Sequence, residues 1–344
     1  MTNPALVDVT RGQLTESLHR GSVAVVDANG KLVCGVGDFE ARVFPRSAIK
    51  ALQAIPLVES GAAEALDLSD AELSLACASH NGEEVHANSA RVMLMKAGLT
   101  EDDLECGPQW PKRMEDAAKL ILADETPCGL HNNCSGKHAG FLGLAKVMGV
   151  ETKGYVEPSH PVQREIRNVM EQMTGDVVSE DVCGTDGCSI PTYASPLNSF
   201  ARAFAAFGTG EGLEPLRQDA AQRIFDACIN EPYMVAGADR FCTNVMEGFR
   251  GRVFVKTGAE GVFCASIPEL GYGVALKCDD GATRAAEVMM ATVLEVMLEL
   301  DEAEAKLLDG LVNPPILTRR GAEAGVIRPR SEFLQMLKEA LSAN

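Results

Sequence analysis

The alternation of apolar and polar residues predicts strands near both ends of the chain and helices between them. Residues 22–27 and 31–36 are rich in β-branched side chains and flank Ala28-Asn29-Gly30. Asn-Gly between two such runs predicts a β-hairpin. Farther along, three short apolar runs separated by glycine-containing turns predict strands over residues 252–256, 262–267 and 273–277. A long central segment thus separates two groups of strands.

In that central segment, apolar residues recur at the spacing of an α-helix. Ser159 stands ahead of Pro161 as a candidate N-cap, and Gly175 ends the same run. Ser195-Pro196 opens another run in the same way, and Gly208 ends it. By the same reasoning, further helices are expected over residues 47–60, 84–97, 216–230 and 283–298.

These elements predict an α/β protein of the α+β type, in which one antiparallel sheet is built from both ends of the chain and helices surround it. A chain of 344 residues can bury a core of this size, and we expect a single domain. The expected boundaries are 1–344 for the domain, about 20–40 and 250–300 for the sheet, about 47–240 for the helical part, and about 310–344 for a C-terminal extension with a last helix near 331–341.

Composition narrows the partners and the compartment. The net charge of −18 means that nucleic acid and anionic membrane surfaces would repel the chain. No apolar stretch approaches the ~20 residues of a membrane span, and residues 1–8 lack the cationic start and apolar run of a signal peptide. Eleven cysteines, scattered from Cys34 to Cys278, do not form a disulfide framework. We therefore expect a cytoplasmic protein with reduced thiols.

Three motifs together indicate one chemistry: Ser47-Ala48-Ile49-Lys50, Ser79-His80-Asn81 and Lys256-Thr257-Gly258. They follow the order of the serine–lysine acyl-transfer site of penicillin-binding proteins and serine β-lactamases. Residues three apart on a helix share a face, so the Lys50 amine can reach the Ser47 hydroxyl and take its proton. Only 32 positions separate Ser47 from Ser79, which implies a reduced or rearranged helical part. Without an export signal, the expected substrate is an intracellular amide or ester.

A second cluster of reactive side chains occupies residues 131–138, directly before an apolar helical run. It is not a P-loop, because His131 and His138 stand where that motif needs Gly and Ser or Thr. A helix N-terminus there can still favour a carboxylate. The spacing gives no zinc motif either, because C-x-x-C is absent and the C-x4-C of 183–188 is weak. Cys134 and Cys188 lie in polar, glycine-rich loops, so a functional role and an inert one both remain open.

With residues 46–50, 79–82, 133–138, 184–188 and 256–261 in view, the chain resembles the rhizobial-type (class 3) L-asparaginases over nearly its whole length. The resemblance implies a fold related to serine β-lactamases and glutaminases, and a homodimer. It implies two Ser-Lys pairs, Ser47 with Lys50 and Ser79 with Lys256. It also implies a zinc ion beside the pocket. The implied zinc ligands are Cys134, Lys137 and Cys188, and the residues implied around the substrate or near the site are Arg46, Asn81, His138, Asp186 and Cys242.

The expected reaction is hydrolysis of L-asparagine to L-aspartate and ammonia through an acyl-enzyme. Asp186 suits the α-ammonium of the substrate, and Arg46 suits its α-carboxylate. A lysine base must be neutral, and burial and neighbouring cations lower the pKa of a lysine. Lys137 can bind zinc only as a free amine, so the metal affinity should depend on pH.

Two other functions stay open on the sequence. A cytosolic glutaminase or related amidase differs in substrate by one methylene group. A non-catalytic, zinc-dependent amino-acid-binding protein would keep Cys134, Lys137, Cys188 and Asp186 without needing Ser47 and Lys50. Outside the motifs, His19, His86 and His160 are expected at the surface, and Trp110 in the core or an interface.

Overall fold

A computed structural model describes residues 2–342. Its contacts divide the chain into two compact units, each made of separate segments of sequence. Unit 1 takes the N-terminal segment up to Ala48, the segment Ser195–Ala206 and the C-terminal segment from Val255 onward. Unit 2 takes Ile49–Ala194 and Phe207–Phe254.

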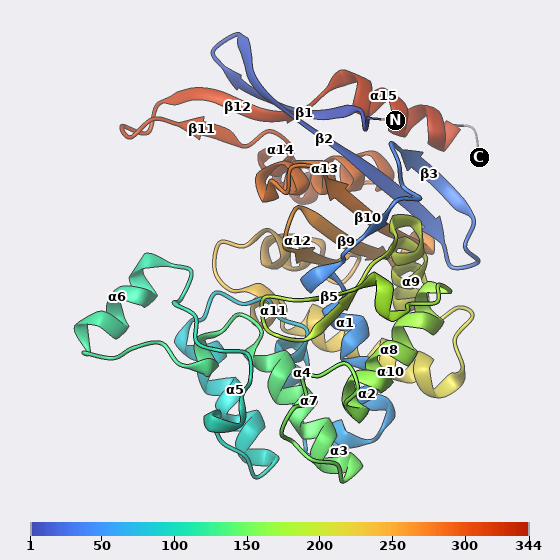
Figure 1. Ribbon diagram of the computed structural model, residues 1–344. Coiled ribbons are helices and arrows are strands. Elements are labelled where there is room, and N and C mark those ends of the chain that lie inside the picture. Colours follow the sequence, from blue (N-terminus) through green and yellow to red (C-terminus); the bar gives the residue numbers. More distant parts are fainter. Residues whose placement is uncertain (1, 343–344) are drawn as a thin grey trace. The chain divides into compact units, whose positions relative to one another are not determined.

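Unit 1 is organised around an eight-stranded sheet whose strands come from both ends of the sequence (Figure 1). The order is β11-β12-β1-β2-β10-β9-β8, and β3 pairs with β2 beside this path. The strands are β1 (Ala5–Arg11), β2 (Leu14–Asp27), β3 (Leu32–Val36), β8 (Phe254–Gly258), β9 (Val262–Ile267), β10 (Tyr272–Cys278), β11 (Pro315–Leu317) and β12 (Glu323–Pro329). Neighbouring strands from β11 through to β9 run antiparallel. The sheet expected from the sequence is confirmed, including the hairpin of β2 and β3.

The C-terminal segment contributes two strands to this sheet. β12 lies antiparallel to β1, with Val9 opposite Ile327, and β11 lies beside β12. The apolar pattern did not predict β1, β11 or β12. Polar residues interrupt these strands, and β12 has only two fully buried positions, so the apolar signal in each is short.

Helices of unit 1 pack directly on the sheet strands. α13 contacts β9, β10, β1 and β12, and α15 contacts β1 and β3. Gly273 on β10 permits the close approach of α9, because a Cβ there would lie 1.9 Å from the carbonyl oxygen of Ala201. The helices are α9 (Leu197–Thr209), α13 (Thr283–Met297), α14 (Glu302–Val312) and α15 (Ser331–Ser342).

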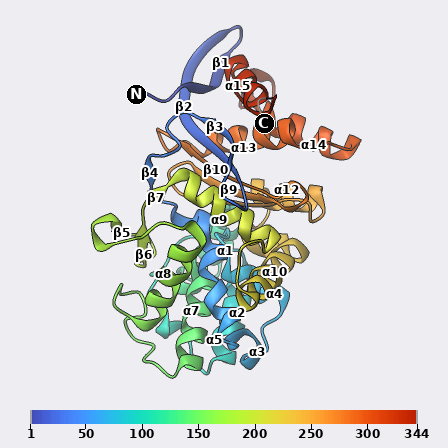
Figure 2. The same ribbon diagram turned by 90° about the vertical axis from the view of Figure 1, so that its right-hand side faces the viewer.

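Unit 2 is helical apart from the short hairpin of β5 (Cys183–Thr185) and β6 (Pro191–Tyr193). α7 (Ser135–Met148) is its central helix, with residues 135–145 all buried; Figure 2 shows it among its neighbours. Gly136 lets α7 contact α4, because a Cβ there would lie 2.3 Å from the Leu75 carbonyl oxygen. The other helices are α1 (Lys50–Gln53), α2 (Ile55–Glu59), α3 (Ala62–Ala65), α4 (Asp70–Ala76), α5 (Glu84–Lys96), α6 (Met114–Leu122), α8 (Pro161–Thr174), α10 (Pro215–Asn230), α11 (Pro232–Ala236) and α12 (Phe241–Phe249).

Three of the predicted helices need correction. The helix expected over 47–60 is broken into a 3-10 turn (Arg46–Ile49), α1 and α2, because Pro56 has no N–H with which to continue the α-helical ladder. The N-cap of α8 is His160 rather than Ser159, since the His160 ring accepts from the Val162 N–H. Ser195-Pro196 forms strand β7, paired with β4 (Arg42–Val43), so α9 starts at Leu197, one residue later than expected.

The helical run expected after residue 138 begins earlier, because α7 starts at Ser135, inside the 131–138 cluster. The other predicted helices are confirmed to within two residues at each end. Among residues 2–342, no helix combines the length and the apolar character that crossing a membrane requires.

Candidate active site

The amine of Lys50, the first residue of α1, is enclosed within unit 2. The side chain has no exposed surface. Its Nζ donates to the Ala78 carbonyl oxygen at 2.5 Å and to the Ser79 hydroxyl oxygen at 2.9 Å. A third bond runs to Cys134 Sγ at 3.0 Å. Three acceptors match the three protons of an ammonium, so Lys50 must release one of these bonded protons before it can act as a base.

Backbone contacts on both sides fix Ser79 beside this amine. The Ser79 N–H donates to the Val235 carbonyl oxygen at 2.9 Å. The Ser79 carbonyl oxygen accepts a bond from the Arg240 guanidinium at 3.1 Å. The residue lies between α4 and α5 and is buried. Its backbone is therefore held in place by groups far away in sequence.

Asn81 helps to hold Ser79 in position. Its Nδ2 donates to Glu83 Oε1 at 3.0 Å and to the Ala238 carbonyl oxygen at 2.9 Å, which uses both amide protons. Its Oδ1 accepts from the same Arg240 nitrogen that bonds to Ser79, at 3.0 Å. Glu83 also accepts from the Ala238 N–H at 2.9 Å. The group expected to bind substrate thus has its donors engaged inside the protein.

His80 and His86 are buried, and their rings form a stack with that of Tyr233. The rings of His80 and His86 lie 4.8 Å apart and 8° from parallel, and those of His86 and Tyr233 lie 5.7 Å apart. The Gly82 N–H donates to His80 Nδ1 at 3.0 Å, which leaves Nε2 to donate to Ser135 Oγ at 2.9 Å. Burial, and then the neighbouring positive groups, lower the pKa of His80 well below its ordinary value. The structure therefore holds His80 as the neutral imidazole.

The three predicted zinc ligands lie together in unit 2. Cys134 is the N-cap of α7 and Lys137 lies in its first turn, while Cys188 lies in the loop between β5 and β6. Lys137 Nζ donates to Cys188 Sγ at 3.1 Å, and all three side chains are buried. Asp186 is also beside this group, with Oδ1 at 3.9 Å from Cys188 Sγ. The sequence spacing alone did not predict this meeting.

The charges in this cluster depend on one another. A hydrogen bond from Cys188, followed by the ammonium groups of Lys50 and Lys137, lowers the pKa of Cys134 well below its usual range, although burial opposes this. The same hydrogen bond, together with burial, raises the pKa of Cys188. Burial acts to lower the pKa of Lys137, but attraction to Cys134, Cys188 and Asp186 outweighs it and raises that pKa. These shifts favour a proton on Cys188 over one on Cys134, and they oppose loss of the proton from Lys137.

The donor set fits a zinc ion. Two sulfur atoms and one nitrogen are donors that zinc prefers, and three protein ligands leave a fourth position open. The bonds that now link Lys137 with Cys188 and Cys134 with Cys188 run through protons that a cation would replace. Lys137 would have to bind as the free amine.

His138, predicted near the substrate, is a fully buried residue of α7. Its Nδ1 lies 2.7 Å from the Tyr155 hydroxyl, and its Nε2 has no hydrogen-bond partner among residues 2–342. Burial, then Lys137 and Lys50, lower the pKa of His138. A neutral ring with one open nitrogen is able to bind a polar group.

Cys242 is a buried residue of α12 in unit 2, and the remaining predicted residues lie in unit 1. Lys256 on β8 is buried, and its Nζ donates to the Thr257 carbonyl oxygen at 3.0 Å. Gly258 approaches the turn that carries Ser47, because a Cβ there would lie 2.6 Å from the Pro45 carbonyl oxygen and 3.1 Å from the Ala48 nitrogen. Arg46, in the same turn, has a φ of 51°. The K-T-G strand and the Ser47 turn thus meet within unit 1.

Sequence reasoning missed several supporting residues. Glu83 and Arg240 hold Asn81 and Ser79, yet neither belongs to a recognised motif. The only signal was the position of Glu83 directly after Ser-His-Asn-Gly. His19 and His86 were expected at the surface and are buried instead, 4% and 0% exposed, which corrects that prediction. Trp110 is 46% exposed and does not lie in the core.

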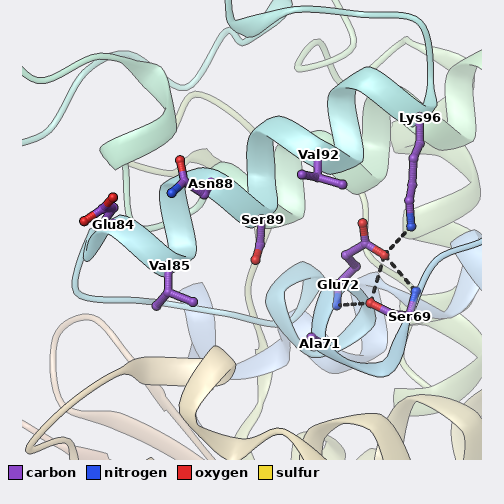
Figure 3. Close-up of a pocket in the computed structure, with 9 residues that line it drawn as sticks. All are labelled: Ser69, Ala71, Glu72, Glu84, Val85, Asn88, Ser89, Val92 and Lys96. Atoms are coloured by element: carbon purple, nitrogen blue, oxygen red, sulfur yellow. Dashed lines mark hydrogen bonds and ion pairs between the residues drawn. The ribbon is translucent and has the colours of Figure 1, made fainter.

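A separate pocket lies between α4 and α5 (Figure 3). At one end, Glu72 Oε2 accepts bonds from the Ser69 hydroxyl at 2.9 Å and from Lys96 Nζ at 2.7 Å. None of the residues predicted for chemistry lines this pocket. The lining residues are Ser69, Ala71, Glu72, Glu84, Val85, Asn88, Ser89, Val92 and Lys96.

Known proteins give one family match and several structural likenesses. The L-asparaginase II family model matches residues 7–329. No curated protein matches the chain significantly. Three similar solved structures are Mglu in its native form (13% identity, TM-score 0.45, covering 85% of this chain and 64% of that one), a putative β-lactamase from Bacteroides dorei (16%, 0.39, 75% and 84%), and a Bacillus glutaminase in 4.3 M NaCl (13%, 0.37, 85% and 89%).

This chain therefore spans less than two thirds of the length of Mglu. β-Lactamase and glutaminase are the fold relatives expected from the sequence. Because these TM-scores lie below 0.5, the likenesses assign neither a reaction nor a substrate.

Proposed function

Because the chain belongs to the L-asparaginase II family, we propose that it is an amidohydrolase that converts L-asparagine to L-aspartate and ammonia. Family membership supports amide hydrolysis in general, and the asparagine substrate is the finer part of the proposal. The observation that carries the mechanism is the buried contact between Lys50 Nζ and the Ser79 hydroxyl at 2.9 Å. A lysine amine bonded to a serine at a buried position is suited to proton transfer.

We assign Ser47 as the nucleophile and Lys50 as its base. The 3-10 turn of Ser47 runs directly into α1, so the two residues are three apart in a continuous helical stretch. The neutral Lys50 amine accepts the Ser47 proton as Oγ attacks the amide carbon. The resulting ammonium returns the proton to the departing nitrogen, and ammonia leaves an acyl-serine ester. Water then attacks the ester, which releases aspartate and restores the serine.

Ser79 takes the role of a proton relay on the same amine. Its hydroxyl already accepts a bond from Lys50, and it can pass a proton on without a large movement. Lys256 is proposed to supply a second cation to this chemistry, as the partner of Ser79 in the second Ser-Lys pair. Because Asn81 has both amide protons engaged by Glu83 and Ala238, we assign it to positioning Ser79 rather than to the substrate.

Three groups are proposed to surround the amino-acid substrate. Asp186 is assigned to the α-ammonium, Arg46 to the α-carboxylate and His138, through its open Nε2, to a polar group of the substrate. The negative Asp186 would pair with the only positive charge that asparagine carries.

Cys134, Lys137 and Cys188 are proposed to hold one zinc ion. When bound, zinc supplies positive charge beside the pocket. Cys134 Sγ is also an acceptor for Lys50, so a proposed metal ligand and the base are in direct contact. Replacement of Cys134 should therefore disturb both groups.

Ammonia release from L-asparagine and L-glutamine tests the proposal directly. We expect rapid release from asparagine, slow release from glutamine, and loss of both in Ser47→Ala, with the exposed Ser60→Ala as the control. Equal or faster release from glutamine would assign a glutaminase instead. Calorimetric binding of asparagine with no turnover by the zinc-loaded protein would indicate an amino-acid-binding protein. The homodimer and the cytoplasmic location remain predictions.

A further inference from the structure

A second group of potential metal ligands lies in the sheet of unit 1. His19 is on β2, Cys278 ends β10, and Asp280 follows it by two residues. An imidazole nitrogen, a thiol sulfur and a carboxylate oxygen lie within 4.8 Å of one another. These residues play no part in the proposed hydrolysis. They are also distinct from the cluster of Cys134, Lys137 and Cys188.

Strand pairing brings the three side chains together. β10 runs antiparallel to β2 with Cys278 opposite Gly21, and the pairing continues one residue further, where the Asp279 N–H donates to the Arg20 carbonyl oxygen at 2.9 Å. Asp280 is thereby placed beside His19. The Cys278 N–H also donates to the Gly261 carbonyl oxygen at 2.8 Å. The side chains thus project from backbone that is fixed on both sides, as a preformed binding site requires.

The carboxylate lies between the other two groups. Asp280 Oδ2 is 2.6 Å from His19 Nδ1, and Oδ1 accepts from Cys278 Sγ at 3.0 Å and from the Ala282 N–H at 3.0 Å. The side chains of His19 and Cys278 are buried, whereas that of Asp280 is 51% exposed, so the group opens to solvent through the aspartate. His19 Nε2 has no hydrogen-bond partner among the described residues. No second bond therefore fixes the tautomer of the ring, which can present a lone pair at Nδ1.

We propose that His19, Cys278 and Asp280 form a binding site for a divalent transition-metal ion of the zinc class. Nitrogen, sulfur and oxygen donors in one cluster suit such an ion, and three protein ligands leave a further position for water. On binding, the thiol of Cys278 releases its proton to solvent, and the remaining imidazole proton resides on Nε2. Bonds from the metal to Nδ1, Sγ and a carboxylate oxygen replace the two hydrogen bonds that now link the side chains. The ion would tie the end of β10 to β2.

The first experiment measures zinc content by elemental analysis in the full-length protein. We expect two zinc ions per chain in the wild type and one in Asp280→Asn. The asparagine keeps the size of the residue and its bonds to Ala282 and His19, so the variant should fold. Cys264→Ala is the matched control, because Cys264 is a buried cysteine of the neighbouring strand β9 outside the cluster. It should keep both ions.

The second experiment isolates the new site. In a Cys134→Ser/Cys188→Ser background, Co²⁺ titration should still give a thiolate-to-metal absorption band with one equivalent bound. Adding Cys278→Ser should abolish the band, and Asp280→Asn should weaken Co²⁺ binding by at least about tenfold. Neither readout depends on asparagine hydrolysis. Each therefore tests the metal site whether or not the proposed function is correct. Unchanged Co²⁺ affinity in Asp280→Asn, or no band in the background protein, would overturn the site.

Discussion

Lys50 donates a hydrogen bond to the Ser79 hydroxyl at 2.9 Å inside unit 2. Sequence resemblance paired Lys50 with Ser47 and assigned Ser79 to Lys256, so this contact joins the two expected pairs through a single amine. The amine is fully buried and also bonds to Cys134. We therefore expect the effects of changes at Lys50, at both serines and in the metal cluster to depend on one another.

The first prediction concerns the base. Lys50→Met keeps much of the side-chain volume and removes the amine, so kcat should fall by about 10²–10⁴-fold, the usual contribution of a positioned proton-transfer group. Ser79→Ala should also be severely impaired. The double variant should lose little more than Lys50→Met alone, because residues that act as a unit are not additive. Steady-state ammonia release measures all three.

Lys146→Met, an exposed change on α7, is the control for the loss of a lysine. Full activity there, with unchanged circular dichroism in every variant, would separate chemistry from folding. If Ser47→Ala kept substantial turnover while Ser79→Ala was dead, the nucleophile and the relay would have to be exchanged. If both serine variants remained active, the serine mechanism itself would be wrong.

The second prediction concerns Arg240, which bonds to the Ser79 carbonyl oxygen and to Asn81 Oδ1. Arg240→Ala should lower kcat by about 10²-fold, because displacing a reacting group by about 1 Å has an effect of that size. KM should change little, since the guanidinium positions Ser79 rather than the substrate. Arg240→Lys should restore part of the loss. A large rise in KM with normal kcat would show that Arg240 contacts substrate instead.

The third prediction concerns pH. Burial lowers the pKa values of His80 and His86 below those of the unfolded chain, about 6.5. The unfolded chain therefore binds more protons below that pH, so the stability is complete above about pH 6.5 and is lost as the pH falls toward the folded-state values. Each histidine should contribute a slope of up to about 1.4 kcal/mol per pH unit in that window.

Urea unfolding at a series of pH values measures this effect. His86→Phe keeps an aromatic ring in the stack with His80 and Tyr233 but cannot be protonated, so its stability should depend less steeply on pH. Parallel curves for wild type and His86→Phe would contradict the assignment.

The fourth prediction concerns the metal cluster at α7. Cys134→Ala should remove one zinc ion per chain and raise KM for asparagine more than it lowers kcat, if the ion mainly organises the pocket. Elemental analysis and steady-state kinetics on the same preparations test both parts. A normal KM with a collapsed kcat would indicate that the cluster takes a direct part in the chemistry.

The fifth prediction concerns packing. A methyl group at Gly136 would lie 2.3 Å from the Leu75 carbonyl oxygen, so Gly136→Ala should lower the free energy of unfolding by about 1–3 kcal/mol. At Gly140, one turn along the same helix, the nearest atoms would be 3.3 Å and 3.5 Å away and belong to side chains. Gly140→Ala should therefore be much milder. Equal effects of the two changes, measured by urea unfolding, would show that α4 can move away from α7.

Local signals predicted much of the fold. Asn29-Gly30 between two apolar runs predicted the β2–β3 hairpin, and the apolar runs at 262–267 and 273–277 predicted β9 and β10. The division between α1 and α2 follows from the missing N–H of Pro56, which is a local feature of the sequence. The pairing of β1 with β12 could not be predicted in the same way. The two strands lie far apart in the sequence, so no short motif or residue spacing indicates that they pair.

The sequence predicted which residues take part in the chemistry, but it did not predict which of them are in contact. The motifs named Lys50 and Ser79 without indicating that they touch, since a contact across 29 residues depends on how α1 and the segment after α4 pack. Arg240 is farther still, 161 residues from the carbonyl that it holds. A single guanidinium in a chain of 344 residues gives no sequence signal of such a task.

The order of strands in the sheet has a consequence for biosynthesis. β1 leaves the ribosome long before its partner β12, which follows it in the sequence by more than 300 residues. At roughly 5–20 residues per second, about 15–60 s separate their appearance. Throughout that interval, one edge of β1 presents unpaired backbone N–H and C=O groups, which attract other strands. Because β2 pairs with the opposite edge of β1, the nascent chain depends on chaperones or other transient contacts to cover this edge until β12 has been synthesised.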